Sequence, residues 1–197
     1  MKTEDIEIIA DKIKNAIENE FTCHNYDMAL SLISVCASIY YHTNIKYTDQ
    51  YLETRISSIA DNLNLVKTEP FKADDDVVLF WDGFGLNNRG LARIYLKALC
   101  KIKTVIYVTY EDRKDSIPDL EKIISEGGGI NRFIKRKKTS YTKMIESLNA
   151  IVSDMRPGHL FFYSVPDDVV ATSIMYAYEG RLIRYQVNLT DHAFWLG

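Results

Sequence analysis

The fold of this chain is decided by the stretch Val77-Val-Leu-Phe-Trp-Asp-Gly-Phe-Gly-Leu-Asn-Asn-Arg-Gly90. It opens on five consecutive apolar residues, Val77–Trp81, and passes through a turn with two glycines into the helical pattern of Arg89–Lys101. A short apolar run bounded by turn residues is typical of a strand that is buried on both faces. A strand followed at once by a helix is the repeating unit of a parallel sheet. The stretch therefore predicts the first strand, turn and helix of an α/β fold.

The same alternation continues toward the C-terminus. The predicted strands are Val77–Trp81, Thr104–Thr109, Arg132–Ile134, His159–Tyr163 and Leu182–Leu189, and the predicted helices are Arg89–Lys101, Ile117–Glu126, Tyr141–Met155 and Asp167–Tyr178. Parallel strands need crossover helices, and these crossovers are right-handed. We expect residues 77–197 to form a Rossmann-like domain with a five-stranded parallel sheet in the order 3-2-1-4-5.

Residues 1–66 have a different, helical rhythm. Apolar residues recur every three or four positions in three segments, which predicts a leader of three helices. Asn25 or Asp27 is the candidate cap of the second helix, and Thr48 is the candidate cap of the third. These two helices resemble one tetratricopeptide-like hairpin, which would pack against the following domain because a solenoid needs at least three copies. Residues 67–76, with Pro70 and Asp74-Asp75-Asp76, are predicted to be a linker.

Composition excludes several classes of protein. The 197 residues carry a net charge of −3, which gives no electrostatic case for binding nucleic acid. The three cysteines lie far apart, no metal-ligand spacing appears, and no run of about 18 apolar residues exists. We therefore expect a cytoplasmic protein without a metal site or a transmembrane segment, and a peripheral membrane contact stays open.

Candidate binding residues follow the strand ends. In open α/β sheets, ligands bind beyond the carboxyl ends of the strands, near the point where the strand order reverses. Gly83 and Gly85 would let backbone amides approach an anion, although two glycines could equally serve a tight turn alone. The substrate-binding candidates at this edge are Gly83, Phe84, Gly85, Asn88, Arg89 and Ser164.

Asp191 and His192 follow the last predicted strand and are the catalytic candidates. A histidine titrates near neutral pH, so it can act as a base or donate a hydrogen bond, and the neighbouring carboxylate could orient its ring. The alternative is a structural histidine that is bonded to nearby backbone. A basic run, Arg132, Lys135–Lys138 and Lys143, is explained either as a solvated surface or as a site for phosphate or anionic headgroups.

Several of these stretches are similar to one enzyme family. The segment Arg184-Tyr-Gln-Val-Asn-Leu-Thr-Asp-His-Ala-Phe-Trp-Leu-Gly197 resembles the close of the N-terminal Rossmann-like domain of bacterial glycosyltransferases with the GT-B fold. The strand and turn at Val77–Phe84 and the stretch His159–Asp167 fit the same domain. Asn25–Leu30 and Tyr47–Glu53 resemble helical leaders that precede some of these enzymes.

The resemblance implies an acceptor-binding domain whose partner is a C-terminal domain that binds the nucleotide-sugar. It implies that the turn with Gly83 and Gly85 approaches the donor, and that His192, with Asp191, contacts the reacting sugar. The co-substrate would be a nucleotide-sugar, the acceptor a glycan or protein, and no metal or other cofactor is implied. The donor domain is absent from this chain, so we expect residues 1–197 to be inactive alone, and we expect Phe194 and Trp195 to lie on a bare face that promotes association.

Two alternatives stay open. The chain could be a non-catalytic protein-binding module, made of a helical hairpin and a flavodoxin-like domain. It could also be a small nucleotide-responsive regulator, although it lacks the early paired aspartates and the lysine that phosphoryl signalling would need.

Overall fold

The structure is a computed structural model, and it describes residues 3–66, 71–86, 90–137, 140–187, 189 and 193–197. Its elements in chain order are α1 (Thr3–Thr22), α2 (Tyr26–Thr43), α3 (Gln50–Asn62), β1 (Asp74–Asp82), α4 (Gly90–Leu99), β2 (Thr104–Tyr110), the 3-10 helix η1 (Glu111–Ser116), α5 (Pro118–Glu126), β3 (Ile130–Ile134), α6 (Tyr141–Met155), β4 (Pro157–Tyr163), α7 (Val169–Ala177) and β5 (Ile183–Gln186).

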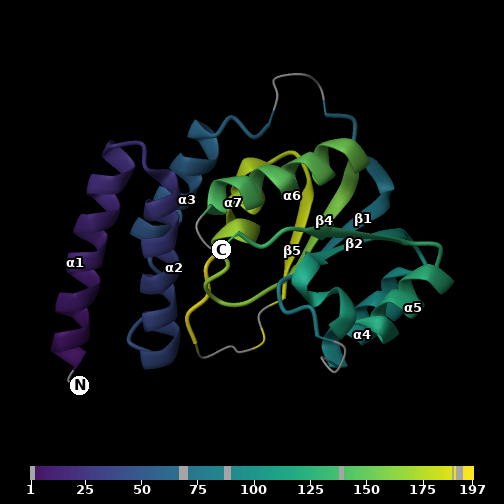
Figure 1. Ribbon diagram of the computed structural model, residues 1–197, viewed down its shortest axis with the longest axis horizontal. Helices are drawn as coiled ribbons and strands as arrows, with labels where there is room; N and C mark the ends of the chain where they lie inside the picture. Colours follow the sequence, from purple (N-terminus) through teal and green to yellow (C-terminus); the bar gives the residue numbers. More distant parts are fainter. Residues whose placement is uncertain (1–2, 67–70, 87–89, 138–139, 188, 190–192) are drawn as a thin grey trace.

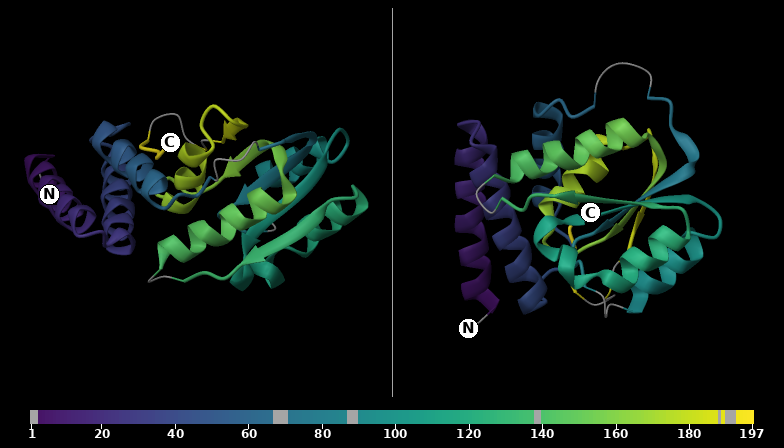
Figure 2. Two further views of the ribbon diagram at one scale, coloured as in Figure 1. Left: turned by 90° about the horizontal axis from the view of Figure 1, so that it is seen from above. Right: turned by 45° about the vertical axis from the view of Figure 1, so that its right-hand side comes forward.

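The sheet confirms the predicted topology. Its five strands are all parallel and lie in the order β3-β2-β1-β4-β5, so the fold is Rossmann-like. Helices α4 and α5 cover one face and α6 and α7 cover the other, and the right-hand view of Figure 2 shows α6 above the sheet with α4 and α5 below it. The strand order reverses between β1 and β4, which places a topological switch point at their carboxyl ends.

Burial explains why the central strands are continuous apolar runs. Along β1, Leu79 and Trp81 pack into the core under α6 and α7, whereas Phe80 packs into a second core under α4 and α5. A strand that is covered on both faces needs apolar side chains at every position. The edge strands β3 and β5 are less buried and carry polar residues.

The leader forms the predicted three helices and shares a core with the sheet. Residues of α2 and α3 belong to the same buried cluster as residues of β1, β4, α6 and α7. The closely packed pair is α1 with α2, rather than the second and third helices, and α3 makes its main contact with α7. Helix α1 is therefore the outermost layer of the molecule (Figure 1).

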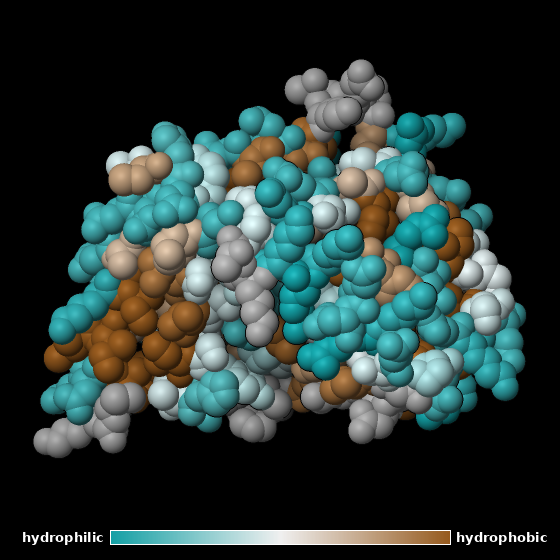
Figure 3. Space-filling model, viewed as in Figure 1, coloured by the Kyte–Doolittle hydropathy of each residue, from teal (hydrophilic) through white to brown (hydrophobic). Residues whose placement is uncertain are grey.

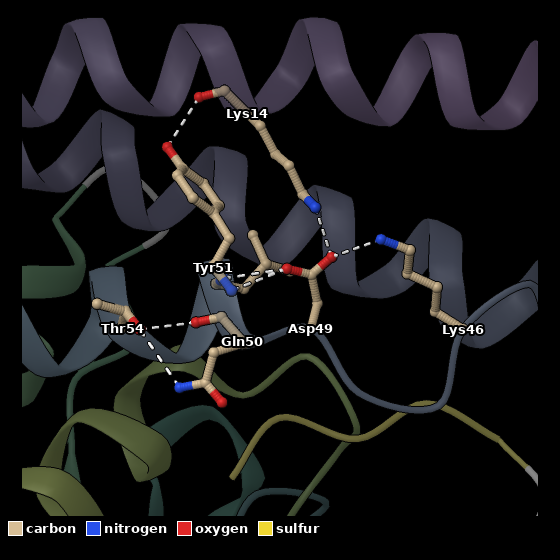
Figure 4. Close-up of polar contacts among 7 residues, drawn as sticks. Lys14, Lys46, Asp49, Gln50, Tyr51 and Thr54 are labelled. Carbon is tan, nitrogen blue, oxygen red and sulfur yellow. Dashed lines mark hydrogen bonds and ion pairs between the residues drawn. The ribbon is translucent and has the colours of Figure 1, made fainter.

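A buried carboxylate joins α1 to α3 and to the loop between α2 and α3. Asp49, and not Thr48, caps α3: its Oδ1 accepts from the backbone amides of Tyr51 and Leu52 at 3.1 and 3.3 Å. Its Oδ2 accepts from Lys14 of α1 at 2.5 Å and from Lys46 at 3.2 Å (Figure 4). Burial alone would raise the pKa of Asp49, but the bonds and charge of the two lysines hold it below the usual value.

Two expectations are wrong in detail. Asp74-Asp75-Asp76, predicted as linker, are the first residues of β1, because the Asp74 amide donates to the Arg156 carbonyl at 2.8 Å beside β4. Phe194 and Trp195 do not lie on a bare face, since their exposed fractions are 0% and 5%. Their rings contact Tyr40 and Tyr41 of α2.

Candidate functional site

A pocket of about 470 Å³ lies at the carboxyl edge of the sheet, at the switch point. Its walls come from the turn after β1, the residues that follow β2 and β3, the β4–α7 turn, and the leader helix α2. The lining residues are Ser34, Gly83, Phe84, Leu86, Tyr110, Arg113, Arg136, Tyr141, Met144, Val165, Asp167, Asp168, Val169 and Val170. The leader and the sheet therefore build this pocket together.

Four of the predicted site residues meet at this edge. A Cβ atom on Gly83 would lie 2.9 Å from Asp168 Oδ2 and 3.1 Å from Ser164 Cβ, so the turn after β1 and the turn after β4 are in direct contact. Gly83 and Phe84 line the pocket. Gly85 and Ser164 are buried behind it, with Ser164 only 5% exposed.

The glycine turn does not present the free amides that we expected. The Gly83 amide donates to the Tyr163 carbonyl at 2.9 Å, and the Phe84 and Gly85 amides donate to Asp82 Oδ1 at 2.9 and 2.8 Å. These three donors are already used inside the protein, which removes them as an anion cradle. Gly85 has a φ of +56°, and a Cβ there would meet Thr109 and Arg113, so the two glycines serve the tight turn.

The other four predicted residues, Asn88, Arg89, Asp191 and His192, lie outside the described residues. The residues on either side of Asp191 and His192 pack apart from each other. Leu189 packs against the core under α4 and α5, whereas Phe194 belongs to the core shared with the leader. The catalytic assignment of Asp191 and His192 stays a prediction.

Asp168 is the carboxylate of the pocket with a displaced pKa. Burial raises the pKa of Asp168 to about 6, although hydrogen bonds from the Ala171 amide and from Trp81 favour its charged form. Its Oδ1 caps α7 through the Val170 and Ala171 amides, and its Oδ2 accepts from Trp81 Nε1 at 2.8 Å. Both oxygens are occupied, so Asp168 positions the pocket wall.

Two arginines bring positive charge to the pocket. Arg136 follows β3, stacks at 4.1 Å from the ring centroid of Tyr110, and lies 3.8 Å from Asp112. Arg113, in η1, has a buried Nε that finds no hydrogen-bond acceptor in the described part of the chain. Sequence reasoning missed Arg113, although its place three residues beyond Tyr110, at the end of β2, puts it at the ligand-binding edge.

Hydroxyl and carboxylate groups complete the lining. Ser34 of α2 donates to Asp167 at 3.2 Å, which joins the leader to the β4–α7 turn. Tyr110 and Tyr141 add two phenol groups, and burial raises the pKa of Tyr110 well above its usual value, so that this phenol stays protonated. Apolar surface from Phe84, Leu86 and Met144 lies beside them. Such a mixture suits a ligand with several hydroxyl groups and an apolar ring face.

Comparisons with family models, curated proteins and solved structures found no match to this chain. Within the described ranges, no group of three or more His, Cys, Asp or Glu residues could hold a metal ion. The helices in those ranges also include none that is long and apolar enough to cross a membrane.

Proposed function

We propose that residues 1–197 are the acceptor-binding part of a glycosyltransferase that moves a sugar from a nucleotide-sugar to a glycan or protein acceptor. The observation that carries this proposal is the pocket at the switch point, because this is where parallel α/β sheets bind their ligands. Its aromatic, hydroxyl and carboxylate groups are those that contact the faces and hydroxyl groups of sugars. The resemblance of Arg184–Gly197 to glycosyltransferases supports the same function.

In this proposal the two halves of the enzyme have separate tasks. The pocket described above holds the acceptor, and a second domain holds the nucleotide-sugar. His192, assisted by Asp191, would contact the reacting sugar or take the proton of the acceptor hydroxyl. Charge that develops on the leaving diphosphate must be stabilised by preorganised groups. We therefore expect transfer by the full-length protein and none by residues 1–197 alone.

The test is transfer by the natural full-length protein with a panel of nucleotide-sugars, followed by His192→Ala. We expect that variant to lose about 100- to 10,000-fold in kcat, the usual contribution of a general base. His42→Ala is the matched control, because His42 is exposed on α2. Absence of transfer with every donor would reject the proposal, and unchanged turnover in His192→Ala would remove the histidine from the mechanism.

One observation favours the second candidate, a non-catalytic protein-binding module. Exposed apolar side chains gather on the leader, where a hydrophobic surface covers part of α1 and α2 (Figure 3). The large apolar residues that are exposed on α1 and α2 are Ile8, Ile9, Met28 and Val35. Contiguous apolar surface of this kind marks interaction sites. A binding module predicts no sugar transfer by the full-length protein with any donor of the panel.

A further inference from the structure

We propose that the switch-point pocket binds a hydroxylated acceptor through an anionic group, a carboxylate or phosphate, that Arg113 and Arg136 hold. This inference rests on the proposed function, which it deepens by naming the chemical class of the acceptor. It goes beyond a general sugar site, because a neutral sugar would leave the charge of both arginines unused.

The unsatisfied donor of Arg113 is the first step of the argument. Its Nε is buried and has no acceptor among the described residues, and no carboxylate of those residues lies within ion-pair distance of its guanidinium. Leaving a buried polar group unpaired costs about 1–3 kcal/mol, more for a charged group. Buried donors without a partner are rare in folded proteins and call for an explanation. The Nε itself is shielded by protein, so a ligand anion would contact the part of the Arg113 side chain that lines the pocket, whose charge no carboxylate of the described residues balances.

Arg136 supplies a second guanidinium to the same pocket. Its contact with Asp112 is long, at 3.8 Å, and the Asp112 side chain is 53% exposed, so this pair neutralises little of its charge. The stacking on Tyr110 at 4.1 Å holds the guanidinium plane in place. A planar guanidinium fixed in this way binds carboxylate and phosphate oxygens with two parallel hydrogen bonds.

The carboxylates of the pocket are engaged elsewhere. Asp168 accepts from two backbone amides and from Trp81, and Asp167 accepts from Ser34. Their bonds direct them toward α7, Trp81 and the leader, while the arginines lie on the side of β2 and β3. The arginines follow β2 and β3, whereas the carboxylates follow β4, so an acidic group on the ligand would meet the arginines. The pocket volume of about 470 Å³ falls within the range of small-molecule sites.

The experiment measures binding to residues 1–197 and needs no donor or transfer. Glucuronate and glucose 6-phosphate are titrated against the chain, with shifts of the methyl signals of Leu86 and Met144 as the readout, and glucose and UDP serve as comparisons. We expect saturable shifts with one or both of the anionic sugars and at least 10-fold weaker binding of glucose. Equal binding of glucose, or tighter binding of UDP than of either anionic sugar, would overturn the proposal.

Variants separate the arginines from the rest of the fold. Arg113→Gln removes the charge-assisted hydrogen bonds and should weaken binding about 10- to 100-fold. Arg113→Lys should recover part of that loss, because lysine restores the positive charge but not the two parallel hydrogen bonds of a planar guanidinium. Arg93→Gln, an arginine on α4 that is paired with Asp119 and does not line the pocket, should bind as the parent does. Parent-like binding by Arg113→Gln, with an unchanged circular dichroism spectrum, would overturn the assignment.

The outcomes distinguish this inference from the function on which it rests. Transfer by the full-length protein to a neutral acceptor, together with no binding of the anionic sugars, would reject the anion site and leave the glycosyltransferase standing. Binding of the anionic sugars that depends on Arg113, without any transfer by the full-length protein, would support the anion site and reject the glycosyltransferase function.

Discussion

Two buried aspartates perform the same local task in this molecule and have opposite electrostatic surroundings. Asp49 caps α3 in the leader, and Asp168 caps α7 beside the pocket, each with two backbone amides on Oδ1. Asp49 has two lysines on its other oxygen and a lowered pKa, whereas Asp168 has the indole of Trp81 there and a pKa raised to about 6. The cap geometry is shared, and the neighbouring cations decide the cost of the buried charge.

The comparison also separates a structural junction from a binding region. In the leader, the one carboxylate of the cluster is paired with two lysines inside the protein, so Asp49 joins α1 to the start of α3. At the switch point, the negative charge of Asp168 and the positive charges of Arg113 and Arg136 do not pair with each other. A region that leaves its charges unmatched is typical of a site whose ligand completes them.

Removing each carboxylate should have the largest effect on stability and should affect the two sites unequally. Asp49→Ala loses the cap and leaves two lysines without their partner, so we expect a loss of about 4 kcal/mol in the free energy of unfolding. Asp168→Ala loses a cap and one indole bond but also relieves a buried charge, so we expect about 2 kcal/mol. Urea unfolding at neutral pH measures both values. Asp61→Ala, an exposed position in α3, is the control and should change stability by less than about 0.5 kcal/mol. Equal losses for the two variants would contradict the comparison.

The pH dependence of stability should have opposite signs at the two sites. The folded pKa of Asp168 is raised from 3.8 to about 6, so the stabilisation from its proton is complete below about pH 4 and is lost as the pH rises through 6. This shift corresponds to about 3 kcal/mol. The folded pKa of Asp49 is lowered, so its contribution is present above pH 4 and is lost as the pH falls further.

Urea unfolding between pH 3 and pH 7 tests these signs with isosteric variants. Relative to Asp168→Asn, the parent should gain stability as the pH falls from 7 to 4. Relative to Asp49→Asn, the parent should lose its advantage below about pH 4. A parent whose difference from Asp168→Asn stays constant from pH 4 to pH 7 would show that the Asp168 pKa is not raised.

A smaller effect tests the contact between the glycine turn and Asp168. Gly83→Ala would place a methyl group 2.9 Å from Asp168 Oδ2 and 3.2 Å from the Ser164 Cα, so we expect a loss of about 2 kcal/mol. Gly90→Ala in α4 is the matched control, because a Cβ atom there meets no atom of the described residues within 4 Å and alanine favours a helix. Thermal unfolding should show a lower midpoint for Gly83→Ala and an unchanged or higher one for Gly90→Ala. A midpoint for Gly83→Ala that matches the control would show that the turn after β1 can shift to make room for the methyl group.

The sheet could be predicted from sequence because buried parallel strands are apolar throughout and alternate with amphipathic helices. That pattern located all five strands and the three leader helices, and the strand order was predicted by assuming the common doubly wound topology. It could not show that Asp74 extends β1, because this depends on a backbone partner at Arg156 that is 82 positions away in the chain. The cap at Asp49 rather than Thr48 is a local choice, since Asp49 Oδ1 accepts from the amides of Tyr51 and Leu52, and both residue types favour this position, so the pattern left the start of α3 open by one residue.

The sequence predicted where the site lies, but not which groups could donate hydrogen bonds to a ligand there. Strand order placed Gly83 and Ser164 together, and the structure has them in contact. The amides of the turn looked available in sequence because nothing local shows that the Asp82 carboxylate takes two of them. Arg113 was not predicted as a site residue, because a single arginine in a polar turn forms no recognisable sequence pattern.

Residues 194–197 pack against the leader helices α2 and α3. Phe194 packs on Tyr40, and the Gly197 amide donates to Glu53 across 144 positions of sequence. During synthesis α2 and α3 leave the ribosome long before these partners exist, so the leader cannot complete its packing until translation has passed Gly197. Contacts of such long range slow folding. We therefore expect the exposed apolar surface of α2 and α3 to need protection from other nascent chains until residues 194–197 have been synthesised.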